Sequence, residues 1–357
     1  MKRRALLGAL LAPTLVSHGA APPPSAGQAL RFPRDHGAHL EAAIEWWYAT
    51  GWSGSFDAPS HGFQLTFFRA RLDLPDAPGG RFAPAQLIFA HAALTDLGAR
   101  RHRHDQRIAR WNGRPGALPA HAGTEGTALR LGHWTLVDSG DGYRARLAAE
   151  GFALELSLTR RQPRLLQGRD GLSRKGPLPQ QTSHYVTEPQ LAAGGRIQAD
   201  GRTHDVRGRA WLDHEWADSF LPDGAVGWDW VGINLADGAA LTAFRLRDGR
   251  GATLWAGGSW RAAGGPAQDF GPQEVFWEPG RRWLSPATQA QYPVEWALRT
   301  PAGEFVVAAL LDAQELDSRR STGTVYWEGL SELRDGQGRR VGLGYLEMTG
   351  YVAPIRL

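Results

Sequence analysis

The segment AWLDHEWADSFLPDGAVGWDWVGINL, residues 210–235, contains four tryptophans, five carboxylates and one histidine within 26 residues. If Ala210–Trp216 forms a strand, alternate side chains point to opposite sides of a sheet. His214 then shares one side with Trp216 among apolar neighbours, whereas Asp213 and Glu215 point to the other side. The pattern therefore predicts His214 and Trp216 as inward residues and the two carboxylates as supporting groups.

The second half of this segment has the same period. In Trp228–Leu235, Asp229 alternates with apolar residues, while Trp228 and Trp230 point oppositely. Burial disfavours the ionised form of an acid and raises its pKa, as a proton donor near neutral pH requires. We therefore predict that Asp229 is the acid of a site and faces one cavity together with His214 and Trp216.

Less specific interpretations stay open for each of these residues. His214 fits a core histidine that is satisfied by a backbone carbonyl. A slip of one residue in the strand register would turn Asp229 to solvent. The tryptophans fit an ordinary apolar core, and Asp213 and Glu215 fit exposed turns.

The composition indicates an all-β protein. The chain has 357 residues with 15 tryptophans, 45 glycines and 23 prolines, and few segments have the apolar period of a core helix. Phe152, Leu154, Leu156 and Leu158 alternate with smaller or polar residues, which is typical of a half-buried strand. Ser139–Gly142 precedes that strand and suits a hairpin turn.

Two similar halves are predicted. The sequence Leu-Thr-Phe-Phe-Arg at residues 65–69 reappears as Leu-Thr-Ala-Phe-Arg at residues 241–245, and each copy follows a tryptophan cluster. A glycine-rich and charged segment within residues 160–189 suits the connection between the halves. We expect antiparallel β-barrel or sandwich domains at residues 41–190 and 191–357, with a leader at residues 22–40.

The N-terminus is typical of an export signal. Lys2-Arg3-Arg4 precedes the apolar run Ala5–Val16, and small residues follow up to Ala21. This order predicts a signal peptide over residues 1–21, of the Sec or twin-arginine type, and a periplasmic location. The sequence has no cysteine, which excludes disulfides and thiol chemistry.

Several classes of function lack their sequence features. The net charge is +4, and the tightest basic run, Arg100–His104, is expected to be one short loop, so no nucleic-acid partner is predicted. His102 and His104 have a spacing that could bind zinc, but the surrounding arginines oppose a cation. The motifs of serine hydrolases, nucleotide-binding loops and zinc proteases are absent. We expect no metal site.

Further motifs resemble a known family. They are Glu45-Trp46-Trp47-Tyr48, the loop from Leu166-Gln167-Gly168 to Lys175-Gly176, the block from Ala210 to Trp216, Gly227-Trp228-Asp229-Trp230, Tyr326-Trp327-Glu328-Gly329 and Gly344-Tyr345-Leu346-Glu347. With these blocks the sequence resembles the AttH-like and carotenoid 1,2-hydratase family. The resemblance implies two lipocalin-like β-domains in tandem.

The resemblance also implies a chemistry. The carotenoid hydratases of the family use a His-x-Trp pair, matched by His214 and Trp216, and then a Tyr-x-Asp pair. Residues 241–246 contain neither tyrosine nor aspartate, so Asp229 or Glu45 would have to supply the acid. The implied activity is water addition to, or isomerisation of, a C=C bond in an isoprenoid-like substrate, without a cofactor. The residues expected to bind this substrate are Trp228, Trp230, Glu45, Trp46, Trp47, Asp213 and Glu215.

The alternative function is that of a carrier or binding protein. An exported barrel protein can hold an apolar ligand without transforming it, as such folds commonly do. In either case the expected partner is a hydrophobic small molecule or lipid-like compound, with possible peripheral contact to a membrane.

Overall fold

The computed structural model describes residues 29–72, 86–113, 119–219 and 221–355. Apart from one 3-10 turn, η1 (Arg34–His36), every regular element in these ranges is a β-strand, which confirms the all-β prediction. None of the described residues forms a helix with the length and hydrophobicity needed to cross a membrane. The predicted signal peptide, residues 1–21, and leader residues 22–28 lie outside the described ranges.

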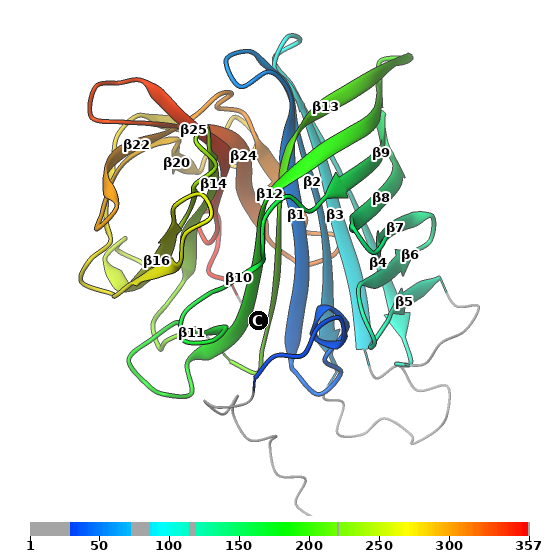
Figure 1. The fold of residues 1–357 in the computed structure, drawn as a ribbon, viewed down its shortest axis with the longest axis horizontal. Coiled ribbons are helices and arrows are strands. Elements are labelled where there is room, and N and C mark those ends of the chain that lie inside the picture. The colour runs from blue at the N-terminus through cyan, green and yellow to red at the C-terminus, as the bar shows by residue number, and fades with distance from the viewer. Residues whose placement is uncertain (1–28, 73–85, 114–118, 220, 356–357) are drawn as a thin grey trace, which may run out of the picture.

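The first of two large antiparallel sheets has 13 strands (Figure 1). Its hydrogen-bonded order is β4-β3-β2-β1-β13-β12-β9-β8-β7-β6-β5, and β10 and β11 pair with β12. It curls until β4 approaches β5 and β6. The strands are β1 (Ile44–Gly54), β2 (Pro59–Arg71), β3 (Gln86–Asp96), β4 (Arg101–Trp111), β5 (Ala120–Ala122), β6 (Ala128–Leu131), β7 (Trp134–Asp138), β8 (Gly142–Ala149), β9 (Phe152–Thr159), β10 (Leu165–Leu166), β11 (Leu172–Arg174), β12 (Thr182–Ala199) and β13 (Arg202–Ala217).

The second sheet has 10 strands in the order β17-β16-β15-β14-β25-β24-β22-β21-β18, and β23 pairs with β24. β19 and β20 form a separate pair. The strands are β14 (Gly227–Leu235), β15 (Ala240–Arg247), β16 (Thr253–Arg261), β17 (Ala267–Phe270), β18 (Phe276–Pro279), β19 (Arg282–Leu284), β20 (Gln291–Pro293), β21 (Glu295–Thr300), β22 (Gly303–Ala309), β23 (Glu315–Asp317), β24 (Val325–Arg334) and β25 (Arg340–Met348).

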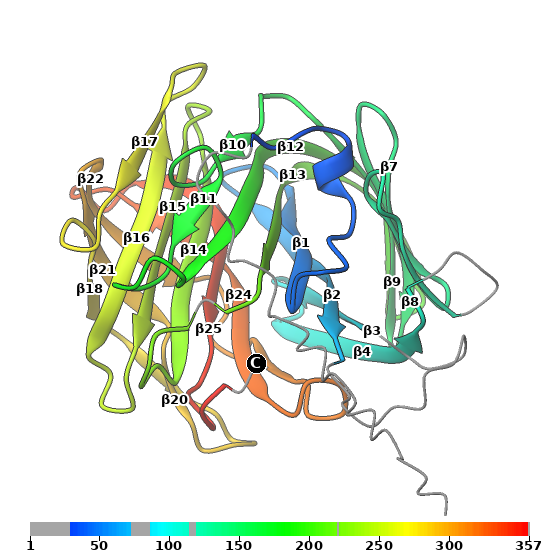
Figure 2. The same ribbon diagram turned by 90° about the horizontal axis from the view of Figure 1, so that it is seen from below.

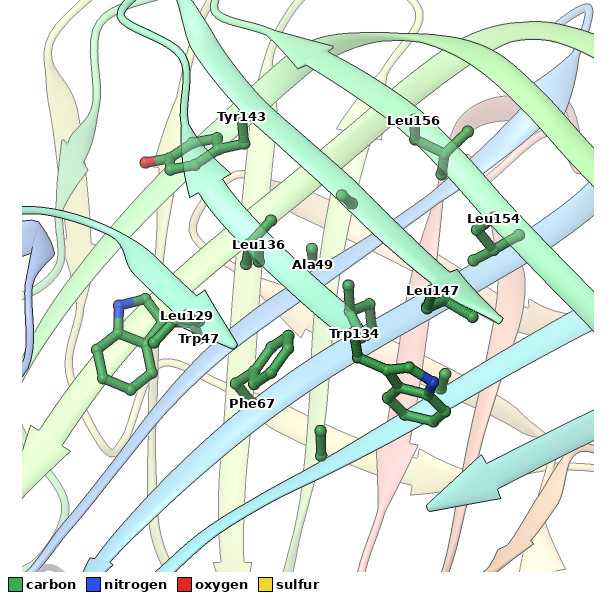
Figure 3. Packing of buried hydrophobic residues seen from close by; sticks show 14 of the residues in the cluster. Trp47, Ala49, Phe67, Leu129, Trp134, Leu136, Tyr143, Leu147, Leu154 and Leu156 are labelled. Atoms are coloured by element: carbon green, nitrogen blue, oxygen red, sulfur yellow. The ribbon is translucent and has the colours of Figure 1, made fainter. Parts of the chain in front are cut away.

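Apolar side chains at every second position of the strands fill the interior of the first sheet. The apolar residues predicted for β9, from Phe152 to Leu158, all belong to its core cluster. Leu136, Trp134 and Leu154 are drawn with other members of the cluster in Figure 3. The predicted hairpin at residues 139–142 joins β7 to β8, where the Ser139 amide donates to the Gly142 carbonyl.

The predicted repeat has a counterpart in the topology. The consecutive neighbours β3-β2-β1-β13-β12 of the first sheet correspond to β16-β15-β14-β25-β24 of the second. The register places Arg69 opposite Glu45 in one sheet and Arg245 opposite Asp229 in the other. Both pairs are buried ion pairs with a distance of 2.8 Å between the arginine Nε and a carboxylate oxygen. Glu45 and Asp229 therefore occupy equivalent positions.

The outer faces of the two sheets pack against each other, as Figure 2 shows for β1, β12, β14 and β24. A third apolar cluster occupies this junction and includes Tyr48 and Trp211 from the first sheet and Trp230 from the second. Gly62 permits close approach, because a Cβ there would lie 2.8 Å from both Leu330 Cβ and the Tyr345 hydroxyl. The sheets thus share a closely packed apolar interface.

Two boundaries differ from the sequence predictions. The predicted domain boundary at residues 190/191 falls inside β12, and the chain changes sheet only after Ala217. The glycine-rich segment before β12 contains two short strands of the first sheet rather than a connection between sheets. The run Arg100–His104, expected to be a loop, largely belongs to β4, an edge strand in the hydrogen-bonded order whose arginines Arg101, Arg107 and Arg110 are exposed, as suits an edge.

Leu136 and Val137 provide a matched test of this alternation. Leu136 is fully buried, whereas Val137 is 40% exposed on the opposite face of β7. We expect Leu136→Ala to lower the free energy of unfolding by about 2–5 kcal/mol because it leaves a cavity in the core. Val137→Ala should change it by no more than about 0.5 kcal/mol. Urea unfolding monitored by tryptophan fluorescence measures both values, and equal losses would contradict the assigned faces.

Candidate active site

A cavity of about 710 Å³ lies between the two sheets. It falls within the range of about 300–1,000 Å³ that is usual for small-molecule sites. Its lining comes mainly from β1, β2, β3 and β13 of the first sheet and from β14, β15, β24 and β25 of the second. Aromatic side chains cover much of its wall, namely Trp46, Phe68, Phe89, Trp228, Trp230 and Phe244.

Four carboxyl groups also face this cavity. Asp213 and Glu215 are alternate residues of β13, and Glu328 and Glu347 are directly paired neighbours on β24 and β25. The two strands that carry Glu215 and Glu347 hold equivalent places in the two sheets. An apolar cavity thus concentrates acids from both halves of the chain.

Asp213 is held in place by hydroxyl groups. The Tyr185 hydroxyl donates to Asp213 Oδ2 at 2.8 Å, and the Thr187 hydroxyl donates to Oδ1 at 2.6 Å. Trp230 Nε1 donates in turn to the Tyr185 oxygen at 3.0 Å. Burial raises the pKa of Asp213 to about 7, although these hydrogen bonds act in the opposite direction.

Glu347 is the most accessible of the four acids, since it is only partly buried. Burial raises its pKa to about 7, and the charges of Glu215 and Asp213 add to the increase. Burial and the charge of Glu347 raise the pKa of Glu328 well above its usual value. Near neutral pH this pair therefore retains protons that exposed glutamates would have lost.

Glu215 has a cationic partner. Lys175, one of only two lysines in the sequence, places Nζ 3.0 Å from Glu215 Oε1. The ammonium group also lies 4.2 Å from the Phe244 ring centre and 4.6 Å from the Tyr185 ring centre. Ser183 donates a short hydrogen bond to the same carboxylate oxygen. Glu215 is thus a neutralised structural acid within the cavity wall.

A chain of hydrogen bonds leads out of the cavity on another side. His91 Nδ1 lies 2.8 Å from the Tyr326 hydroxyl, and Nε2 lies 2.8 Å from Ser321 Oγ. Ser321 donates to the Gln106 amide oxygen at 2.7 Å, so Nε2 must carry the hydrogen and Nδ1 must accept from Tyr326. Burial lowers the pKa of His91 to about 3, which keeps this acceptor free.

The predicted catalytic residues do not share this cavity. His214 and Trp216 point into the first sheet, where His214 Nε2 lies 2.9 Å from Glu45 Oε1 and Trp216 stacks on His39 at 3.8 Å. Asp229 points into the second sheet and is bound by Arg245, with the Tyr351 hydroxyl donating at 2.9 Å.

The prediction that His214, Trp216 and Asp229 face one cavity is therefore wrong, although the faces themselves were assigned correctly. Strands β13 and β14 belong to different sheets, so the inward face of each leads to a different interior. The opposite faces meet at the junction and line the cavity. Of the residues expected to bind substrate, Trp46, Trp228, Trp230, Asp213 and Glu215 line it, and Glu45 and Trp47 do not.

Glu328, Glu347, His91 and Tyr326 were not predicted as site residues. Tyr326, Glu328 and Glu347 belong to the two sequence blocks at residues 326–329 and 344–347 that carry the family resemblance. A carboxylate within a continuous apolar strand was the available indication of a buried acid. His91 lacked such an indication, because its partners lie more than 200 residues away along the chain.

One group in the first sheet has the composition of a metal site. The nearest ligand atoms of His39, Glu45 and His214 all lie within 4.8 Å of one another. Glu45 Oε1 accepts a hydrogen bond from His39 Nδ1 at 2.8 Å and one from His214 Nε2 at 2.9 Å, and its second oxygen binds the Arg69 guanidinium. A cation would have to displace these hydrogen bonds beside a fixed positive charge, so we interpret the group as a buried hydrogen-bond network.

The comparisons with known proteins agree with this architecture. The AttH-like family model matches residues 23–351. The chain belongs to the AttH-like family. A crystal structure described as an AttH protein from Nitrosomonas europaea is 44% identical, covers 93% of this chain and 100% of its own, and has a TM-score of 0.84. The family resemblance and the lipocalin-like fold inferred from the sequence are thus confirmed.

More distant structures share the AttH-like fold. Kievitone hydratase from Nectria haematococca is 12% identical, covering 93% of this chain and 95% of its own, with a TM-score of 0.67. CghA is 13% identical, covering 88% and 90%, with a TM-score of 0.53. No curated protein sequence matched the chain. The fold is therefore one that a hydratase also adopts.

Glu45 tests the buried ion pair inside the first sheet. We expect Glu45→Gln to lower the free energy of unfolding by about 3–5 kcal/mol, because it leaves the fully buried Arg69 without a counter-charge. Glu155→Gln is the control, since Glu155 and its partner Arg196 are both about half exposed, and it should cost about 1 kcal/mol or less. Urea unfolding at pH 7 measures both, and similar losses would contradict the role given to Glu45.

The raised pKa of Glu347 can be tested through the pH dependence of stability. Its folded pKa lies above the unfolded value, so its contribution to stability is present below about pH 4.5 and is lost as the pH rises through 7. Glu347→Gln should therefore match the wild type at pH 5 and be more stable at pH 8.5, on the order of 1–3 kcal/mol. Glu278→Gln, on an exposed position of β18, should show no such change. A variant less stable at pH 8.5 would disprove the raised pKa.

Proposed function

We propose that this protein is an acid–base enzyme of the hydratase type, which adds water to a C=C bond of a hydrophobic, isoprenoid-like substrate. One observation carries the proposal: an aromatic cavity between the sheets holds buried carboxyl groups, and burial raises the pKa of Glu347 among them to about 7. An isolated double bond is a weak base, and it accepts a proton only from an acid placed directly against it in a water-poor site.

Glu347 is the proton donor in this proposal. It has the greatest access to the cavity, and a pKa of about 7 allows it both to give up and to regain a proton under physiological conditions. Proton transfer from its carboxyl to the alkene forms the new C–H bond and leaves a tertiary cation. The indole faces of Trp46, Trp228 and Trp230 line the same space and can stabilise that cation.

Tyr326 and His91 complete the addition. Water attacks the cation and forms the C–O bond, and the resulting oxonium must lose a proton. Tyr326 takes this proton on its oxygen while its own hydrogen passes to His91 Nδ1, along the hydrogen bond of 2.8 Å. A protonated alcohol is a much stronger acid than an imidazolium ion, so a histidine with a low pKa suffices. The net change is addition of one water, and the proton on His91 later returns through solvent to Glu347.

The test follows the atoms of water. The purified protein is incubated with acyclic carotenoids and with shorter prenyl compounds in H₂¹⁸O and in D₂O. Mass spectrometry should show a gain of one water, with the heavy oxygen on the more substituted carbon and deuterium on its neighbour. The rate should fall above about pH 7 as Glu347 loses its proton. A wild-type protein that binds these compounds without adding water would instead be the carrier considered from the sequence.

Variants locate the acid. Glu347→Gln should lower the rate by about 10²-fold or more, whereas Glu278→Gln on the exposed β18 strand should leave it unchanged. His91→Gln should lower it less, because water can accept the oxonium proton. Full activity in Glu347→Gln would remove Glu347 from the mechanism and leave Asp213 as the remaining cavity acid with a pKa of about 7.

A further inference from the structure

Two polar atoms in the cavity wall lack a hydrogen bond of normal geometry among the described residues, the Tyr48 hydroxyl and Glu328 Oε1, although the two side chains interact with each other. Both residues are more than nine-tenths buried, with exposed fractions of 6% and 2%. A buried polar group without a partner costs on the order of 1–3 kcal/mol. Such groups are expected where a ligand supplies the missing partner.

Apart from the partly exposed Glu347, the other buried acids and the histidine of the cavity wall are already occupied. Asp213 accepts from Tyr185 and Thr187, and the Glu215 carboxylate binds Lys175. His91 is engaged through both ring nitrogens. Among the fully buried groups of the wall, the unsatisfied hydrogen-bonding atoms therefore belong to Tyr48 and Glu328, next to Glu347.

Tyr48 and Glu328 come from opposite sides of the junction. Tyr48 lies on β1 of the first sheet, and Glu328 lies on β24 of the second. Burial raises the pKa of Tyr48, and the charge of Glu328 and a hydrogen-bonding contact with it add to the increase, so the two side chains lie close together. The Tyr48 ring meets the Trp230 ring edge-on at 5.3 Å, so an aromatic surface adjoins the polar pair. An oxygen atom of a ligand placed here would be held by both sheets, beside apolar walls.

The charge of the lining decides which kind of oxygen fits. Four carboxyl groups face the cavity, and Lys175, already paired with Glu215, is the one lysine or arginine in the described lining. An anionic head group would meet these acids with no free cation to balance it. A neutral hydroxyl or carbonyl can accept a hydrogen bond from Tyr48 or from the Glu328 carboxyl without this penalty.

We propose that the cavity binds a neutral, largely hydrocarbon ligand with one hydroxyl or carbonyl oxygen, and that this oxygen lies between Tyr48 and Glu328. The proposal rests on the proposed function only in placing the substrate in this cavity. The hydrocarbon part lies against the aromatic wall that includes Trp46 and Trp228. The structure thus assigns a polar anchor in addition to the reacting double bond.

Three compounds with the same carbon chain test the proposal: farnesol, farnesoic acid and farnesene. Titration at pH 7, followed by quenching of tryptophan fluorescence, measures their affinities. Farnesol should bind at least about 5- to 10-fold more tightly than farnesene because it gains one buried hydrogen bond, and farnesoic acid should bind more weakly than farnesol. Equal or tighter binding of the acid would overturn the proposal, as would equal binding of farnesol and farnesene.

Variants assign the anchor to its residues. Tyr48→Phe and Glu328→Leu should each weaken farnesol roughly 5- to 10-fold and leave farnesene unchanged, whereas Glu328→Gln, which keeps a donor and an acceptor, should retain most of the affinity. Tyr292→Phe is the matched control, because its hydroxyl binds Glu315 outside the cavity. Circular dichroism checks that each variant folds. Unchanged farnesol affinity in folded Tyr48→Phe and Glu328→Leu would overturn the anchor.

This experiment and the turnover test can fail separately. Selective binding of farnesol without addition of water to any prenyl compound would end the hydratase proposal and leave the anchor in place. Addition of water by a protein that does not distinguish farnesol from farnesene would leave the hydratase proposal and end the anchor.

Discussion

The packing of the two sheets against each other determines where chemistry is possible in this protein. Each strand has two faces, and one face of β1, β13, β14 and β25 fills the interior of its own sheet. The opposite faces meet at the junction around Tyr48, Trp211 and Trp230. Burial of aromatic side chains, at roughly 25 cal/mol per Å² of apolar surface, stabilises this contact. The cavity beside this contact has largely apolar walls, which strengthen the electrostatic interactions within it.

Two kinds of buried acid result from this arrangement. Glu45 and Asp229 occupy equivalent positions in the two sheets, and each is neutralised by an arginine on the next strand. Such pairs hold strands in register. Glu328 and Glu347 lie beside each other, and no arginine is among the described residues of the cavity wall. Burial raises the pKa of both, the charge of Glu347 adds to the increase for Glu328, and the charges of Glu215 and Asp213 add to it for Glu347. The presence or absence of an arginine opposite the acid therefore separates a structural carboxylate from one that can donate a proton.

The cavity combines residues that neither sheet could assemble alone. The first sheet contributes Trp46, Tyr48 and His91, and the second contributes Tyr326, Glu328 and Glu347. The hydrogen bond between His91 and Tyr326 joins the two sheets. Tyr48 and Glu328 likewise come from different sheets. Any change in the relative position of the sheets would thus alter the proton path and the proposed anchor together. The duplicated architecture provides two stable frames, and function in this proposal belongs to the surface between them.

The sequence by itself determined the strand character of the chain, its repeat and the side of each strand on which a residue lies. These properties depend on local periodicity, and residues such as Phe152, His214 and Asp229 follow it. It also pointed to the family through motifs along nearly the whole chain. Only the tertiary structure decided which face of each strand looks onto the cavity, because both faces are buried here and periodicity cannot rank them. For the same reason Asp213 and Glu215, first assigned a supporting role, line the cavity, while His214 and Asp229 lie in separate interiors.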